Sequence, residues 1–196
     1  ADKNHKQTGQ VLTFDYQVNH VAIIGATGGG KTESTAELFV YYARRFGLHV
    51  IVLDGKRGID WQRFDGVVEW HNMTVETIEY QIDRLTALFN ARLAELKTVG
   101  VGKIYDLPGK RRRPLFVILE EFGYVWSIVQ QNKPLFAKLN GQIDDLFRLG
   151  RAAGIVMCLI DQAPETWSKQ MRANAKFVVC YRLNGNTANV FNEYFA

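Results

Sequence analysis

The sequence predicts an α/β fold in which a mostly parallel sheet is flanked by helices. Short apolar runs of strand length alternate along the chain with longer amphipathic segments, as expected where crossover helices connect parallel strands. One of these apolar runs leads directly into a glycine-rich loop and then into an amphipathic segment. Ligands of such folds bind at the carboxyl ends of the strands, so the residues that end each strand are the first candidates for a functional site.

The expected strands are apolar and rich in Val and Ile. The first, Val11–Tyr16, alternates weakly and is typical of an edge strand. The others are His20–Ile24, His49–Asp54, Val67–Trp70, Leu115–Leu119, Ile155–Ile160 and Phe177–Tyr181.

Helices are predicted over Thr32–Phe46, from Thr74 onward, and over Leu135–Leu149. The helix from Thr74 has Glu76 and Glu79 near its start. Its apolar residues recur at helical spacing, namely Ile78, Ile82, Leu85, Leu88, Phe89 and Leu93. A loop rich in Gly and Pro follows over 100–114 and carries the dense basic cluster Lys110–Arg113.

The length of 196 residues agrees with one α/β domain that has a sizeable core. With 24 Lys and Arg against 20 Asp and Glu the chain is only mildly basic, so its overall charge does not indicate a nucleic-acid binder. Cys158 and Cys180 both lie in apolar runs without metal-ligand spacing, and we expect buried free thiols in a reducing compartment. No apolar run reaches the length of a transmembrane helix.

The segment Gly25–Thr32 matches the phosphate-binding P-loop pattern G-x-x-x-x-G-K-[ST] at every fixed position. Glycines allow the backbone to fold around an anion with its N–H groups inward, and the following helix adds the positive end of its dipole. Lys31 is expected to reach the β- and γ-phosphates and Thr32 to ligate Mg²⁺. The alternative is a glycine-rich turn that binds nothing, which the strand before the loop and the helix after it disfavour. We therefore predict ATP and Mg²⁺ as ligands, contacted by Gly25, Ala26, Thr27, Gly28, Gly29, Gly30, Lys31, Thr32 and Glu33.

Two adjacent carboxylates, Glu120 and Glu121, end the strand over 115–119. A P-loop enzyme needs a carboxylate for the Mg²⁺ shell, and a hydrolase commonly needs another to orient or deprotonate the attacking water. We assign Glu120 to the metal, usually through water, and Glu121 to the nucleophile. Strands also often end in solvated charges, and it is the P-loop upstream that favours the catalytic interpretation. Gln162, after the next strand, is a third candidate to contact the γ-phosphate or the water, with a capping or turn role as the alternative.

Several stretches together resemble the motor domain of the FtsK/SpoIIIE family of hexameric DNA translocases. Gly25–Lys31 has the family's Gly-Ala-Thr-Gly-x-Gly-Lys loop, and Arg151–Ile155 matches the Arg-Ala-Ala-Gly-Ile that precedes a core strand. Leu53–Lys56 is similar to the family's Asp-x-Lys turn. Arg172–Asn174, followed by an apolar strand, is also similar to the family. The chain departs from the pattern at Glu120, where the family usually has aspartate, and at 161–164, where Asp-Gln-Ala-Pro replaces Thr-Gln-Arg-Pro.

The resemblance implies a RecA-like P-loop NTPase domain that assembles into a ring, expected to be a hexamer. ATP would lie between subunits and double-stranded DNA in the central channel, contacted mainly through its phosphates. The loop over 103–113 is a candidate for these contacts, although charged loops are usually just solvated. An arginine from the adjacent subunit would stabilise charge on the transferring phosphoryl group. Arg148, Arg151 and Arg172 are the candidates, each alternatively a salt-bridge or solvated residue.

We accordingly expect an ATP-hydrolysing motor that translocates double-stranded DNA in chromosome or plasmid segregation, conjugative transfer or genome packaging. A related ring ATPase that drives protein secretion is the nearest alternative. An inactive nucleotide-binding module is disfavoured by Lys31, Thr32 and Glu121, and a P-loop kinase by the paired carboxylates, which suit water activation. We expect residues 1–196 to be a single motor domain excised from a longer protein, facing the cytoplasm, with any membrane tether in parts outside this chain.

Overall fold

The computed structural model describes residues 20–56, 58–109, 113–162, 164–181, 183 and 188–189. The edge strand expected at Val11–Tyr16 and the cluster residues 110–112 lie outside these ranges. Within them, no helix is both long enough and apolar enough to cross a membrane.

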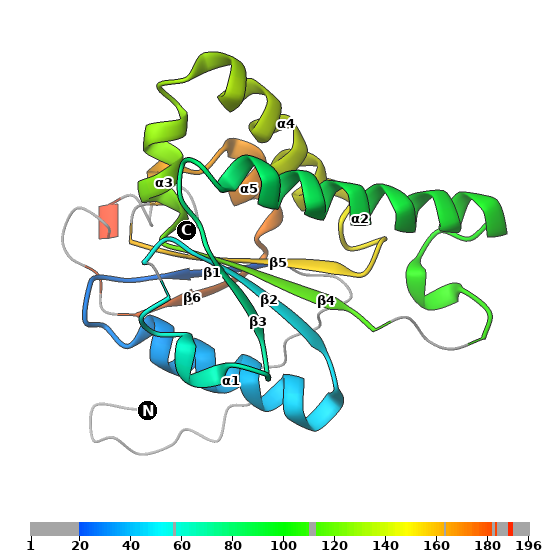
Figure 1. Cartoon of the computed structure of the whole chain (residues 1–196), viewed down its shortest axis with the longest axis horizontal. Helices are drawn as coiled ribbons and strands as arrows, with labels where there is room; N and C mark the ends of the chain where they lie inside the picture. The colour runs from blue at the N-terminus through cyan, green and yellow to red at the C-terminus, as the bar shows by residue number, and fades with distance from the viewer. Residues whose placement is uncertain are drawn as a thin grey trace.

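A parallel sheet of six strands, in the order β3-β2-β4-β5-β1-β6, forms the centre of the domain (Figure 1). Every neighbouring pair of strands is parallel, which confirms the predicted fold class. The strands are β1 Val21–Ile24, β2 His49–Asp54, β3 Glu69–Asn72, β4 Leu115–Glu120, β5 Ile155–Asp161 and β6 Phe177–Cys180.

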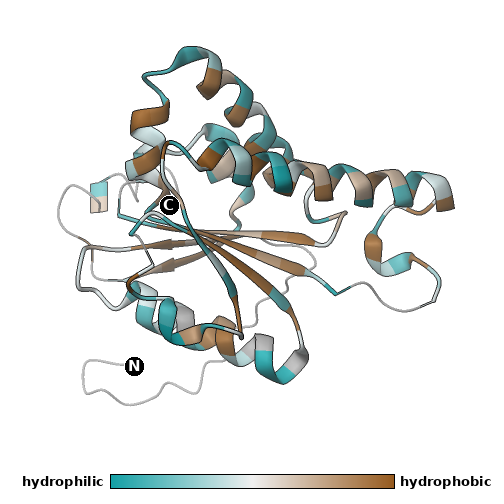
Figure 2. Cartoon of the chain, in the orientation of Figure 1, coloured by the Kyte–Doolittle hydropathy of each residue, from teal (hydrophilic) through white to brown (hydrophobic). Residues whose placement is uncertain are grey.

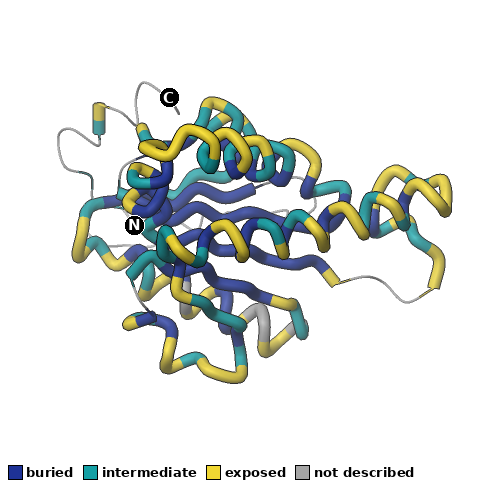
Figure 3. The backbone as a smooth tube through the Cα atoms, turned by 45° about the horizontal axis from the view of Figure 1, so that its top comes forward, coloured by how far each residue is buried: buried dark blue, intermediate teal, exposed yellow. Residues whose placement is uncertain are grey.

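Helices cover both faces of the sheet (Figure 1). One face is covered by α1 (Lys31–Phe46), which packs Phe39 and Val40 against the strands. The other face is covered by α2 (Ile78–Val99), α3 (Phe122–Val129), α4 (Lys133–Leu149) and α5 (Lys169–Asn174). The central strands β1, β2, β4 and β5 are mostly hydrophobic in Figure 2 and buried in Figure 3. Burial on both faces explains why these strands appear in the sequence as continuous apolar runs.

Some expected boundaries shift for identifiable reasons. The strand expected at Val67–Trp70 is β3, two residues later, because Val68 forms an isolated bridge with Asp65 and is buried before the ladder begins. The helix expected from Thr74 begins at Ile78, after a turn in which the Thr77 hydroxyl accepts from the Thr74 N–H at 2.9 Å.

Helices α3 and α5 were not predicted, and the expectation that the Cys180 thiol is buried was wrong. Helix α3 is almost entirely apolar, so it lacks the polar face that reveals a helix in a sequence, and α5 is short. Cys158 is buried as expected, whereas Cys180 is exposed because it ends β6 at the edge of the sheet.

Candidate nucleotide-binding site

The sheet brings the predicted site residues to one edge. In the strand register Ile24 lies beside Asp161, and Asp54 beside Glu120. The segments that follow β1, β2, β4 and β5 therefore leave the sheet at the same level. This places the P-loop, the turn after Asp54, the carboxylates of β4 and Gln162 together, as expected for the carboxyl ends of parallel strands.

The P-loop joins β1 to α1 through backbone that only glycine adopts easily. Gly28 and Gly30 have positive φ angles of 71° and 83°, and a Cβ at Gly25 would lie 2.7 Å from the Tyr181 Cβ. Helix α1 begins at Lys31 without a side-chain cap, because its N-cap is Gly30. The first N–H groups of α1 therefore remain available to an anion, and a bare backbone loop before an uncapped helix fits a phosphate group.

Lys31 lies inside the loop, with only 4% of its surface exposed. Its ammonium donates to the carbonyl of Gly25 at 2.6 Å and to that of Ala26 at 3.1 Å. Burial lowers the pKa of Lys31, and the nearby Glu121 carboxylate acts against this shift. A phosphate that entered the loop would offer Lys31 a charged partner in place of two neutral carbonyls.

Thr32 and Glu120 form the candidate magnesium site. The Thr32 hydroxyl donates to Glu120 Oε1, and the Trp61 indole N–H donates to Glu120 Oε2. Burial raises the pKa of Glu120, while these two hydrogen bonds act against the shift. A hydroxyl beside a carboxylate suits a hard cation such as Mg²⁺.

The rest of a magnesium shell would come from elsewhere. Among the residues that the structure describes, no group of three or more His, Cys, Asp or Glu side chains could hold a metal. Mg²⁺ is usually held by one or two carboxylates together with substrate phosphates and waters. Thr32 and Glu120 would hold the ion beside the phosphates, where it would offset the charge of the triphosphate.

Glu121 has strained backbone and a defined side-chain position. Its φ of 49° is the only positive value at a non-glycine residue in the described part of the chain. Such strain costs on the order of 1 kcal/mol and is found mostly at functional sites. Glu121 Oε1 accepts from Gln162 Nε2 at 2.8 Å, and Gln162 Oε1 accepts from the Thr27 hydroxyl at 2.5 Å. Gln162 therefore bridges the P-loop and Glu121 within one chain.

Lys56 is a site residue to which the sequence analysis gave no role. Its ammonium lies 3.2 Å from Glu121 Oε1 and 3.5 Å from Glu120 Oε1. Burial acts to lower the pKa of Lys56, but Glu120 and Glu121 outweigh burial and raise it. The Asp-x-Lys turn was a signal in the sequence. The pairing of β2 with β4 puts Lys56 beside the two carboxylates, and no pattern in the sequence indicated that pairing.

Asp161, the last residue of β5, holds neighbouring residues of the site in place. Its carboxylate is buried and accepts from the Gly123 N–H at 2.6 Å, the Gln162 N–H at 2.7 Å and the Trp167 indole at 3.1 Å. Burial raises the pKa of Asp161, and these hydrogen bonds act against that shift. Asp161 thus fixes the start of α3 and the direction of Gln162.

The contacts that the structure gives for the arginine candidates lie away from the P-loop of their own chain. Arg151 precedes β5, and its charge lowers the pKa of His20, which precedes β1. Arg151 is therefore at the amino ends of the strands, opposite the P-loop. Arg148 pairs with Asp145 at 2.6 Å, and Arg172 donates to the carbonyls of Pro164, at 3.3 Å, and Trp167. A role for any of them in a neighbouring subunit stays a prediction.

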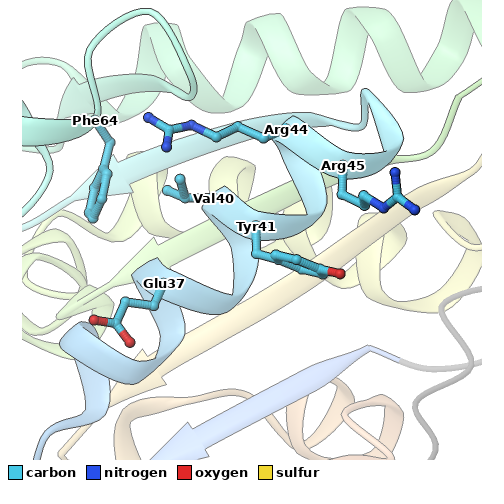
Figure 4. A pocket seen from close by; sticks show the side chains of 6 residues that line it. All are labelled: Glu37, Val40, Tyr41, Arg44, Arg45 and Phe64. Carbon is cyan, nitrogen blue, oxygen red and sulfur yellow. The ribbon is translucent and has the colours of Figure 1, made fainter.

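A hollow of about 530 Å³ lies apart from this site, beside α1 and Phe64 (Figure 4). It is lined by Glu37, Val40, Tyr41, Arg44, Arg45 and Phe64. None of the residues predicted to contact the nucleotide lines it, so the hollow is not part of the candidate site.

Solved structures show which proteins share this fold. The TcpA conjugation coupling protein of pCW3 superposes with a TM-score of 0.75 over 89% of this chain at 19% identity. EssC (ATPases 2 and 3) from Geobacillus thermodenitrificans gives 0.74 over 90% at 17% identity. The genome-packaging NTPase B204 of Sulfolobus turreted icosahedral virus 2, with ATP-gammaS, gives 0.56 over 91% at 14% identity.

The chain shares the fold of these proteins, an α/β fold in which a P-loop follows β1. It spans 52% of the TcpA chain and 34% of the EssC chain, but 83% of the B204 chain. No protein-family model and no curated protein matches the sequence. At identities this low, the likeness shows the fold, and the site residues must carry the functional argument.

Proposed function

We propose that this domain hydrolyses ATP with Mg²⁺ and uses the energy to translocate double-stranded DNA. The position of Glu121 is the observation that supports ATP hydrolysis. This carboxylate is held by Gln162 and Lys56 at the edge of the sheet where Thr32 and the P-loop lie.

In the proposed reaction each residue has a separate task. Lys31 and the N–H groups of the loop would bind the β- and γ-phosphates, and Thr32 and Glu120 would hold Mg²⁺, which would offset the charge of the triphosphate. Glu121 accepts a proton from water as the water oxygen bonds to the γ-phosphorus. The bond from that phosphorus to the bridging oxygen breaks, and ADP and phosphate leave. Gln162 orients the water or contacts the γ-phosphate.

The DNA substrate is supported by resemblance and by two of the compared structures. Those proteins are named for conjugation and for genome packaging, processes that move nucleic acid. In the loop proposed for DNA contact, Arg113 donates to the Gly47 carbonyl at 2.7 Å, so this arginine also serves the fold. Assembly into a hexameric ring, an arginine supplied by the neighbouring subunit and a cytoplasmic position belong to the same proposal.

Protein secretion is the second candidate, favoured by a specific comparison. EccC of Thermomonospora curvata, named for type VII secretion, superposes with a TM-score of 0.66 over 86% of this chain at 23% identity. Its ATPases 2 and 3 are also known in complex with a signal-sequence peptide, a structure that superposes with a TM-score of 0.64 at 17% identity. A polypeptide substrate would leave the hydrolysis chemistry unchanged and would replace only the DNA.

Steady-state ATP hydrolysis with and without double-stranded DNA, over a range of protein concentrations, separates the two candidates. Stimulation by DNA that rises cooperatively with protein concentration supports a ring-forming DNA motor. Hydrolysis that DNA leaves unchanged contradicts DNA translocation and favours secretion. Salt dependence provides a further check, because binding to DNA phosphates weakens steeply as salt rises.

A further inference from the structure

The two oxygens of the Glu121 carboxylate have different surroundings. Oε1 accepts from Gln162 Nε2 at 2.8 Å and lies 3.2 Å from the Lys56 ammonium. Within the described residues, Oε2 has no hydrogen bond or ion pair. The Glu121 side chain is 13% exposed, so it remains accessible to a water molecule. One oxygen is therefore fixed while the other is available.

Lys56 is held in place by the turn that carries it. Asp54 Oδ1 accepts from the Lys56 N–H at 2.7 Å, and Asp54 Oδ2 accepts from the Gly58 N–H at 2.6 Å. Gly55 donates to the Glu120 carbonyl at 2.9 Å. A Cβ at Gly55 would lie 2.9 Å from the Glu121 carbonyl oxygen, so only glycine allows this close approach. The turn after β2 is thus fixed to the end of β4.

Electrostatics gives Lys56 a further role. Glu120 and Glu121 are adjacent acidic residues at an edge where a triphosphate would add more negative charge. Lys56 contacts both carboxylates, at 3.5 Å from Glu120 and 3.2 Å from Glu121. In a partly buried site such contacts are screened less than on the surface, so they restrain where the carboxylates lie.

We propose that Lys56 is a positioning residue for ATP hydrolysis, which holds Glu121 Oε1 so that Oε2 faces the attacking water and accepts its proton. This inference rests on the proposed ATPase function. Lys56 contacts carboxylates rather than the loop that would bind the phosphates. Its loss should therefore lower kcat and leave nucleotide affinity nearly unchanged.

The test compares Lys56→Met, Lys56→Gln and Lys56→Arg with the wild-type chain. A matched control is Lys138→Met, because Lys138 also bridges two carboxylates, Glu79 at 2.9 Å and Asp83 at 2.8 Å, away from the site. We expect Lys56→Met and Lys56→Gln to lower kcat on the order of 10- to 100-fold, with affinity for a fluorescent ATP analogue changed less than about threefold. Lys56→Arg should recover part of the rate, and Lys138→Met should match the wild type.

A double-mutant cycle separates positioning from a merely structural role. If Lys56 acts through Glu121, single-turnover phosphate release by Lys56→Met combined with Glu121→Gln should be no slower than by Glu121→Gln alone. Wild-type rates in Lys56→Met or Lys56→Gln, or independent losses that multiply in the double variant, would overturn the inference while the ATPase function stands. Absence of turnover in the wild-type chain would instead overturn the proposed function, and this inference with it.

Discussion

The Thr27 hydroxyl donates a hydrogen bond to Gln162 Oε1 at 2.5 Å, across 135 positions of sequence. Thr27 belongs to the P-loop and Gln162 to the end of β5, so this contact links the loop that would bind the nucleotide to the carboxylate of Glu121. A phosphate that moves Thr27 would change the position of Gln162, and through it that of Glu121. The geometry offers a direct route from the P-loop to Glu121, the proposed catalytic group.

Disruption of this link should slow turnover without abolishing nucleotide binding. We expect Gln162→Ala to lower kcat by about tenfold or more, because Glu121 loses the hydrogen bond from its amide. Thr27→Val should have the same sign and a smaller effect, since Gln162 keeps its contact with Glu121. Steady-state kinetics together with analogue binding measure both quantities. A rise in KM at unchanged kcat would contradict this role for Gln162.

Trp61 should contribute to stability through Glu120. Its indole N–H donates to the buried Glu120 Oε2, and Trp61 is itself buried. Trp61→Phe removes the donor and leaves a buried carboxylate oxygen unsatisfied, which should lower the free energy of unfolding by about 1–3 kcal/mol. Urea denaturation measures this change. Trp70→Phe is the control, because the Trp70 indole bonds to Asp65 in an exposed position, and its effect should be clearly smaller. Equal losses in the two variants would contradict the account of Trp61.

Buried His20 predicts loss of stability in acid. Burial, and after it the charge of Arg151, lowers the pKa of His20 from 6.5 to about 3. Between these values the unfolded chain binds the proton and the folded chain does not, so stability is present above pH 6.5 and is lost as pH falls toward 3. The loss for this group should be about 2 kcal/mol between pH 8 and pH 5.

Denaturation curves at several pH values for the wild type and His20→Asn test this prediction. In the wild type the Met157 N–H donates to His20 Nδ1 at 2.9 Å. The side-chain oxygen of the asparagine can accept this hydrogen bond in the variant. The variant should therefore show a flatter dependence of stability on pH across this range. An unchanged slope would show that other groups cause the acid sensitivity.

The local parts of the site could be predicted from the sequence. The P-loop is a contiguous motif, and Glu120 and Glu121 directly follow an apolar run that forms β4. Lys31, Thr32, Glu120, Glu121 and Gln162 do meet at one edge of the sheet.

The parts that depend on strand order could not be predicted. Lys56 reaches Glu120 and Glu121, and Trp61 reaches Glu120, because β2 pairs with β4, and nothing local in the sequence specifies that pairing. Helix α3 was missed because it is almost entirely apolar and so lacks the alternation of polar and apolar residues that marks an amphipathic helix. The role proposed for an arginine would require a neighbouring subunit, which a single sequence does not place.

Turnover and binding in Glu121→Gln test the central claim most directly. ATP hydrolysis and analogue affinity should be measured at the same protein concentrations for the wild type, Glu121→Gln and Lys31→Ala. The account predicts that Glu121→Gln binds nucleotide like the wild type while its kcat falls on the order of 100-fold or more, because it lacks the proton acceptor. Lys31→Ala should lose affinity as well. Hydrolysis by Glu121→Gln at the wild-type rate would contradict the account.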